Sequence, residues 1–373
     1  MKMNFILMKV IQMKKYIFNL NSGEIILKPK LDMSKLYIEL SSKCNLKCPM
    51  CFKNTFTDPE GFMTKEIFEK IIADLREFPN LEHVIFGGIG ECVTNPHFLD
   101  MVERVKKEGY MLTITSNGYM LNDLLIVKLI TLGVDELIVS VETGDIGHPS
   151  FKYVEKLMKK ISNYKNQKNT GKPSLAVETV LTRKNYMDFD NIVKMLLPYG
   201  IRKIVISNLI PVYENFLGLE LYADNSKKEE SILRNMISKA VTAKVNAIIP
   251  NFRLKTERHC NFIEKNAAII RWDGEVTPCY RFLHDGIEYV YGKKKEIKAY
   301  SFGNVLKNKL SDIWLSEDYS WFRYKVRNSL YPSCTDCDLR DGCHFIENTE
   351  QDCWGNEPSC ADCLWWRNII MCP

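Results

Sequence analysis

The sequence predicts an α/β protein in which a parallel sheet flanked by helices precedes a small cysteine-rich domain. The first observation behind this is the alternation of short β-branched runs with longer amphipathic runs from about residue 36 onward. The second is a change of pattern after Pro250, where apolar runs shorten and nine of the 13 cysteines lie. We therefore expect an N-terminal hairpin extension over residues 1–35, a strand-and-helix domain over 36–250 and a metal-stabilised domain over 251–373.

Composition and charge narrow the class of protein. The 373 residues are 46% hydrophobic and 26% charged, which is typical of a globular chain with a core. The net charge of +5 is not gathered in one basic block, so nothing indicates nucleic-acid binding. Lys9 interrupts the apolar start and no run approaches about 18 apolar residues, so we expect neither a secretory signal nor a membrane span. An odd count of 13 cysteines fits metal or redox chemistry in the cytoplasm better than disulfides.

Each predicted strand is a short run rich in β-branched and aromatic residues. Two of these runs, YIFNL and EIILKP, surround the turn NSG and predict the N-terminal hairpin. Six more follow in the second domain: LYIELS (36–41), HVIFGG (83–88), MLTITS (111–116), ELIVSV (136–141), LAVETV (175–180) and KIVISN (203–208).

Amphipathic helices separate these strands. After the first strand, the apolar residues of TKEIFEKIIADLREF fall on one helical face, and Thr64 is a suitable N-cap. Three further segments of this kind end at glycine, over residues 96–109, 121–133 and 189–200. Strand-helix repeats imply parallel strands with right-handed crossovers, as an open sheet or a partial barrel. In either architecture the chemistry belongs at the C-terminal ends of the strands.

The loop after the first strand of this domain carries Cys44, Cys48 and Cys51 within eight residues. Three thiolates this close can surround one metal centre. A structural zinc site needs a fourth ligand, and no Cys or His nearby supplies it. Three thiolates on a four-iron cluster instead leave one iron open, although unpaired structural cysteines are also possible.

Two glycine-containing loops follow the next two strands. The second strand ends in GGIGE, where Gly87, Gly88 and Gly90 allow a backbone to pass close to a ligand and Glu91 adds a carboxylate. The third ends in SNG, with Ser116 and Asn117.

These motifs together resemble the radical S-adenosylmethionine (SAM) superfamily, whose fold is a partial (β/α)6 barrel. The resemblance implies that Cys44, Cys48 and Cys51 hold a [4Fe-4S] cluster whose open iron binds S-adenosyl-L-methionine, and that reduction releases a 5′-deoxyadenosyl radical. It also implies a set of SAM-binding residues around the strand ends. This set is Gly87, Gly88, Gly90, Glu91, Ser116, Asn117, Ser140, Glu142 and Asn208.

Two positions depart from the superfamily pattern without touching a cluster ligand. Met50 stands where an aromatic residue is frequent, and it can still pack against the adenine. Cys92 stands where proline is frequent, and we interpret it as a buried thiol rather than a ligand.

The second group of cysteines resembles the SPASM extension of radical SAM enzymes, which holds auxiliary clusters. The resemblance implies cluster ligands among nine thiols, one more than two four-iron clusters need. These are Cys260, Cys279, Cys334, Cys337, Cys343, Cys353, Cys360, Cys363 and Cys372. The spacing departs from the pattern after Cys343, so we expect one of the last four to be spare. The C-x2-C pairs at 334/337 and 360/363 leave tetrahedral zinc as an alternative.

The ending DCWGNEPSCADCLWWRNIIMCP and the segment DPEGFM resemble radical SAM/SPASM maturases of tungsten-cofactor oxidoreductases. The resemblance implies maturation of a partner protein or its tungsten-pterin cofactor, with electrons from a reduced ferredoxin-like donor. One alternative is a similar enzyme that forms thioether or carbon-carbon crosslinks in a ribosomal precursor peptide. Another is a non-catalytic iron-sulfur carrier or scaffold, which would have no use for the SAM motifs.

Overall fold

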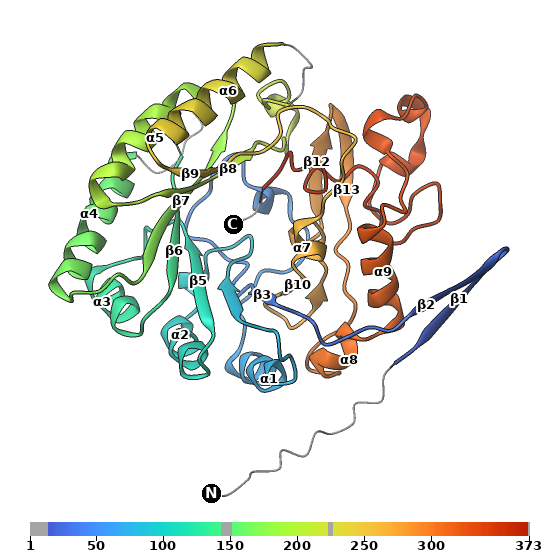
Figure 1. Cartoon of the computed structure of the whole chain (residues 1–373), viewed down its shortest axis with the longest axis horizontal. Helices are drawn as coiled ribbons and strands as arrows, with labels where there is room; N and C mark the ends of the chain where they lie inside the picture. Colours follow the sequence, from blue (N-terminus) through green and yellow to red (C-terminus); the bar gives the residue numbers. More distant parts are fainter. Residues whose placement is uncertain (1–13, 143–150, 223–226, 372–373) are drawn as a thin grey trace, which may run out of the picture.

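The chain folds around one large, mostly parallel sheet, and this computed structural model describes residues 14–142, 151–222 and 227–371. The six predicted strands form the centre of that sheet in chain order and pair in parallel. Figure 1 shows the sheet curving, with helices along its outer side, as expected for a partial barrel. The strands are β3 (Lys35–Ile38), β4 (His83–Phe86), β5 (Met111–Ser116), β6 (Glu136–Ser140), β7 (Ser174–Leu181) and β8 (Lys203–Asn208).

Helices connect the successive strands and cover the outer side of the sheet (Figure 1). As predicted, Thr64 caps the first helix, and its hydroxyl accepts a hydrogen bond from the Ile67 N–H at 3.2 Å. Gly109, Gly133 and Gly200 adopt positive φ angles just beyond the predicted helix ends. The helices are α1 (Lys65–Leu75), α2 (Phe98–Lys107), α3 (Asp123–Thr131), α4 (Phe151–Gln167), α5 (Phe189–Leu196) and α6 (Lys227–Thr242).

The sheet is wider than predicted because short strands extend both of its edges. Strand β9 (Asn246–Ile248) pairs in parallel with β8. At the other edge, β10 (Ala267–Ile270) pairs in parallel with β3, and β11 (Val276–Thr277) pairs antiparallel with β10. Residues beyond 250 therefore complete the sheet that residues 36–250 begin.

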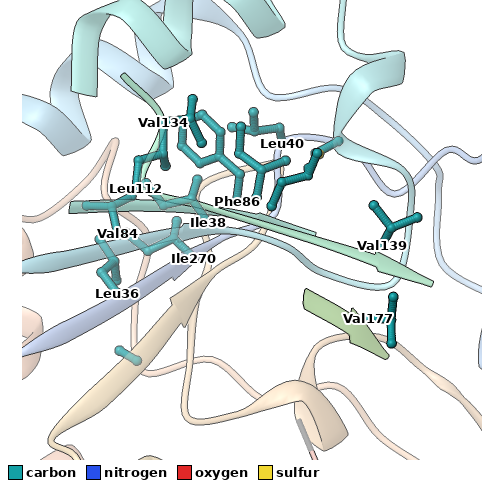
Figure 2. Close-up of a cluster of buried hydrophobic side chains, with 14 of the residues drawn as sticks. Leu36, Ile38, Leu40, Val84, Phe86, Leu112, Val134, Val139, Val177 and Ile270 are labelled. Atoms are coloured by element: carbon teal, nitrogen blue, oxygen red, sulfur yellow. The ribbon is translucent and has the colours of Figure 1, made fainter. Parts of the chain in front are cut away.

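The hydrophobic core lies between the sheet and its helices and includes side chains from both parts. Figure 2 shows Ile38, Val84, Phe86 and Ile270 in one cluster, and all four are fully buried. Burial of such side chains contributes roughly 1.5–3 kcal/mol each. Ile270 joins this cluster from β10, so the C-terminal part packs as a continuation of the barrel.

The remaining elements surround this sheet. Strands β1 (Tyr16–Leu20) and β2 (Gly23–Leu27) form an antiparallel hairpin that projects from the body in Figure 1. A second hairpin and three helices belong to the C-terminal part: β12 (Gly286–Val290), β13 (Lys293–Ile297), α7 (Asn261–Glu264), α8 (Leu310–Trp314) and α9 (Glu317–Arg327). No helix in the described part of the chain has the length and apolar character needed to cross a membrane.

Candidate functional site

A cavity of about 280 Å³, open to solvent, lies at the C-terminal ends of the strands. This is the edge at which the sequence places the chemistry. Its lining brings together thiols, acids and polar strand-end residues from segments far apart in the chain. It includes Cys48, Cys51, Gly88, Thr115, Ser140, Glu142, Glu178, Thr179, Asn208, Tyr280, Trp365 and Met371.

The three predicted cluster cysteines lie in one loop after β3. The Cys51 N–H donates to the Cys48 carbonyl at 3.0 Å, which folds the loop back on itself. Burial raises the pKa of Cys48 to about 12, and the nearby charges of Cys51 and Cys44 add to that rise. Without metal these thiols are therefore protonated at neutral pH, and iron binding must displace their protons.

The glycines of GGIGE are needed for close contact with the protein itself. A Cβ on Gly90 would lie 2.2 Å from the carbonyl oxygen of Ser41, and one on Gly88 would lie 2.5 Å from the Glu39 side chain. A Cβ on Gly87 would lie 2.7 Å from the Tyr280 hydroxyl. Of these three glycines, only Gly88 is among the described residues that line the cavity. The missing side chains thus allow close packing within the protein, and contact of these glycines with SAM stays a prediction.

Glu91 joins GGIGE to SNG. Its carboxylate accepts hydrogen bonds from the Asn117 N–H at 2.7 Å and from the Ser116 hydroxyl at 2.9 Å. Burial raises the pKa of Glu91, and these hydrogen bonds oppose the rise. The structure therefore brings the three predicted residues together, but the carboxylate is occupied by protein donors beside the described lining of the cavity. Their contact with SAM stays a prediction.

Cys92 is buried, as expected. Its thiol lies 3.3 Å from the carbonyl oxygen of Thr115, to which it can donate.

Two carboxyl groups face the cavity from neighbouring strand ends. Glu142, which the sequence analysis named, accepts from the Val180 N–H at 3.3 Å. Glu178, which it missed, accepts from the Ser140 hydroxyl at 2.7 Å. Burial raises the pKa of both. The signal that could have found Glu178 is a charged residue within the apolar strand LAVETV.

The cavity also contains buried polar atoms that lack a partner. Among the described residues, the Thr179 hydroxyl and the Asn208 Oδ1 are buried and have no hydrogen-bond partner. The other half of the Asn208 amide donates to the Ile369 carbonyl at 2.8 Å, so this residue also holds the C-terminal segment in place. Unpartnered polar atoms beside thiols fit a polar organic ligand at a thiolate-bound metal centre.

Four C-terminal cysteines line a second, enclosed cavity together with Phe262, Trp365 and Trp366. We call them the inner group: Cys260, Cys279, Cys360 and Cys363. Burial raises the pKa of Cys360 well above its usual range, and the charges of the other three thiols raise it further. The donor set is four thiols in an apolar enclosure, which fits a four-iron cluster.

Another four cysteines lie close enough together to influence one another's pKa. We call these the outer group: Cys334, Cys337, Cys343 and Cys353. Burial and Asp362 raise the pKa of Cys334 to about 12, and Cys353 and Cys343 are close enough to add to the rise. Cys337 and Cys353 are exposed. Cys372 lies outside the described residues.

The thiols of these groups are not gathered around a single ion. Within residues 14–142, 151–222 and 227–371, no three His, Cys, Asp or Glu side chains stand close enough to hold one metal ion. Tetrahedral zinc brings its sulfurs within about 4 Å of one another. Thiolates bound to separate irons of a cluster stand farther apart than that.

A buried histidine joins the C-terminal part to the strand ends of the barrel. The His284 ring nitrogens lie 2.6 Å from Asp58 Oδ2 and 3.0 Å from Glu39 Oε2. Glu39 in turn accepts from the Ile89 N–H at 3.1 Å, within the glycine loop. A Cβ on Gly61 would lie 2.2 Å from the Trp272 ring, so DPEGFM packs tightly against this region.

Comparison with known proteins finds family models that match two regions of the chain. A model of the radical SAM superfamily matches residues 38–212, and a model of the SPASM iron-sulfur cluster-binding domain matches residues 260–338. The chain is 45% identical over 348 residues to the tungsten-containing aldehyde ferredoxin oxidoreductase cofactor-modifying protein of Pyrococcus furiosus, covering 91% of this chain and 97% of that protein.

Two solved structures share the fold at 16% identity. One is anSMEcpe with bound AdoMet, with a TM-score of 0.59 over 90% of this chain and 95% of that one. The other is Streptococcus suis SuiB bound to precursor peptide SuiA, with a TM-score of 0.57 over 85% of this chain and 72% of that one.

Proposed function

The chain belongs to the radical SAM superfamily and carries its SPASM iron-sulfur domain, and from this premise we propose that it modifies a tungsten-containing cofactor or the oxidoreductase that carries it. It is a radical SAM enzyme whose cofactors are S-adenosylmethionine and [4Fe-4S] clusters. The observation that carries the proposal is the 45% identity to a cofactor-modifying protein across nearly the whole of both chains.

The residues at the cavity beside the strand ends have different roles in this reaction. Cys44, Cys48 and Cys51 would hold the cluster, which with bound SAM supplies a 5′-deoxyadenosyl radical on reduction. Ser140 and Glu142 offer polar groups to SAM, and Glu178 offers a further carboxyl to the substrate. Trp365 and Met371 line the cavity with apolar surface, which would help to shield a reactive radical from water.

The auxiliary clusters belong, in this proposal, to the inner and outer groups, with four thiolates each. A reduced ferredoxin-like protein would deliver electrons.

The first test is SAM cleavage. Anaerobically reconstituted protein, reduced with dithionite, should release 5′-deoxyadenosine, and Cys44→Ala should abolish release. A loaded wild-type protein that releases none would overturn the assignment and favour the carrier alternative.

The second test addresses the substrate. A tungsten aldehyde oxidoreductase should be produced with and without this chain, and with Cys44→Ala as the matched inactive control. We expect the mass of the extracted pterin cofactor, or oxidoreductase activity, to change only with the wild-type chain. No difference among the three would contradict the proposal and direct attention to peptide substrates, for which the fold shared with SuiB is by itself no argument at 16% identity.

A further inference from the structure

Four charged side chains are buried together in the C-terminal part. Arg281 Nε lies 3.1 Å from Glu288 Oε1, and Arg281 Nη2 lies 2.8 Å from Asp362 Oδ1. Lys295 Nζ lies 2.8 Å from the second oxygen, Asp362 Oδ2. Each of the four side chains is no more than 3% exposed. They form one continuous network, Glu288–Arg281–Asp362–Lys295.

This network reaches from one cysteine group to the other. At one end, Arg281 follows Cys279 by two residues, and its partner Asp362 stands between Cys360 and Cys363 in the chain. At the other end, Lys295 reaches the outer group through Ile346, a neighbour of Cys334.

The backbone supports the same link between the groups. The Cys334 N–H donates to the Ala361 carbonyl at 3.1 Å, which joins the first cysteine of the outer group to the residue beside Asp362. Lys295 Nζ also donates to the Ile346 carbonyl at 3.1 Å, and Ile346 packs against Cys334. Asp362 thus lies at the junction of the inner and outer groups.

Burial of these charges is costly, and one donor in the network is left without a partner. Taking a charged group out of water costs several kcal/mol, and ion pairing recovers this only when every donor is satisfied. Among the described residues, Arg281 Nη1 is buried and makes no hydrogen bond. An acceptor at that position would remove the penalty, and thiolate sulfurs of a loaded inner group are acceptors that the metal-free thiols replace only weakly.

We propose that Arg281, Asp362 and Lys295 form a shared electrostatic link between the two auxiliary centres, in which Arg281 raises the reduction potential of the inner centre and Lys295 that of the outer centre. The proposal rests on the inner and outer groups holding those clusters. Each added electron makes a cluster more negative, and an adjacent cation in a low-dielectric interior stabilises the reduced state. Asp362 pairs with both cations, and its negative charge opposes their effect on the two reduction potentials. These three residues therefore act as positioning residues that set the order in which the two centres accept electrons.

The test is a reductive titration of the loaded protein, followed by electron paramagnetic resonance. In Arg281→Met we expect reduction of the inner centre to become at least tenfold less favourable, which is about 59 mV for one electron, with a smaller change at the outer centre. Lys295→Met should reverse that order. Asp362→Asn should raise both potentials. Arg281→Lys keeps the charge and should change the inner potential less than Arg281→Met does.

Two controls separate a tuning role from a structural one. Lys203→Met removes a cation from a half-buried pair with Glu136 at the start of β8 and should leave both potentials unchanged. The double variant Arg281→Met with Glu288→Gln removes a cation and its partner anion together. No unpaired carboxylate is left at position 288, which favours folding, and the cation beside the inner centre is still removed.

Three results would overturn the inference. Potentials that match wild type in a fully loaded Arg281→Met protein would refute it alone. Equal shifts at both centres in Arg281→Met and in Lys295→Met would also refute it. A wild-type protein with only about four irons per chain would refute the ligand assignment and the inference together.

Discussion

At the residue scale, Gly90 illustrates why a short glycine motif tolerates so little change. A Cβ there would lie 2.2 Å from the Ser41 carbonyl oxygen and 2.7 Å from that of Lys43. Both contacts are with backbone, so no side-chain rotation relieves them. The Glu91 N–H also donates to the Lys43 carbonyl at 2.8 Å, and a shift in this loop would strain that hydrogen bond.

Gly90→Ala should therefore lower the free energy of unfolding by about 1–3 kcal/mol, as overpacking typically does. It should also weaken SAM binding, because the cluster loop and the glycine loop would separate. Gly171→Ala is the matched control, since no atom lies within 4 Å of a Cβ at that position. Chemical denaturation of both variants checks the prediction. Equal stability of the two would show that the loop accommodates a side chain.

The same scale shows what residue chemistry can and cannot predict. Cysteine spacing predicts Cys44, Cys48 and Cys51 as cluster ligands because few other sites need three thiols on one loop. Glu178 escaped notice because a carboxyl in a strand is usually on a solvated face, and only the cavity reveals that it faces Ser140. Sequence spacing assigned Glu91 to SAM binding but did not predict its hydrogen bonds to Ser116 and Asn117, which depend on loop geometry.

At the element scale, strands were predicted well where local pattern decides them. The predicted bounds of β5 and β8 are those of the structure, because each is a short β-branched run that is buried at most of its positions. Strand β10 was missed because its four residues pair with β3, more than 220 positions earlier, and a four-residue apolar run by itself is ambiguous. The sheet order at its edges depends on such long-range pairing.

The His284 contact with DPEGFM gives a prediction at this scale. Burial opposes the charged imidazole, but hydrogen bonds to Asp58 and Glu39 outweigh it and raise the pKa of His284 from 6.5 to about 9. A raised folded-state pKa stabilises the fold fully below about pH 6.5, and that contribution is lost as the pH rises through about 9. Arg271, 3.5 Å from Asp58, stays charged across this range and does not change the sign.

The urea midpoint of wild type should therefore be lower at pH 9.5 than at pH 7. The corresponding loss in the free energy of unfolding is roughly 2–3 kcal/mol at most. His284→Gln keeps a hydrogen-bonding side chain but cannot ionise, so its midpoint should be lower at pH 6.5 and change less over the same interval. Lys203→Met again serves as a control for loss of an unrelated cation. Parallel curves for wild type and His284→Gln would rule out the charged histidine as the source.

At the scale of the whole molecule, the two cysteine groups explain how a chain with few C-terminal helices holds its shape. Nine thiols beyond residue 250 allow many pairings, and sequence spacing stopped discriminating after Cys343. In the structure the chain turns back after Cys353, so Cys360 and Cys363 join Cys260 and Cys279 while Cys353 stays with the outer group. Metal binding would then tie residues about 100 positions apart, and its free energy becomes folding free energy.

This partition leads to a prediction about metal content. Anaerobically reconstituted wild type should hold about twelve irons per chain, and Cys353→Ser and Cys360→Ser should each lose about four, from the outer and the inner centre respectively. Cys372→Ser, the ninth thiol, should keep about twelve irons. All three variants retain Cys44, Cys48 and Cys51, so dithionite-dependent release of 5′-deoxyadenosine should persist in each. Loss of iron from Cys372→Ser together with full loading of Cys353→Ser would exchange the roles of these two thiols. Because the exposed outer centre is where a partner protein can approach most closely, Cys353→Ser should also slow reduction by an external carrier more than Cys360→Ser does.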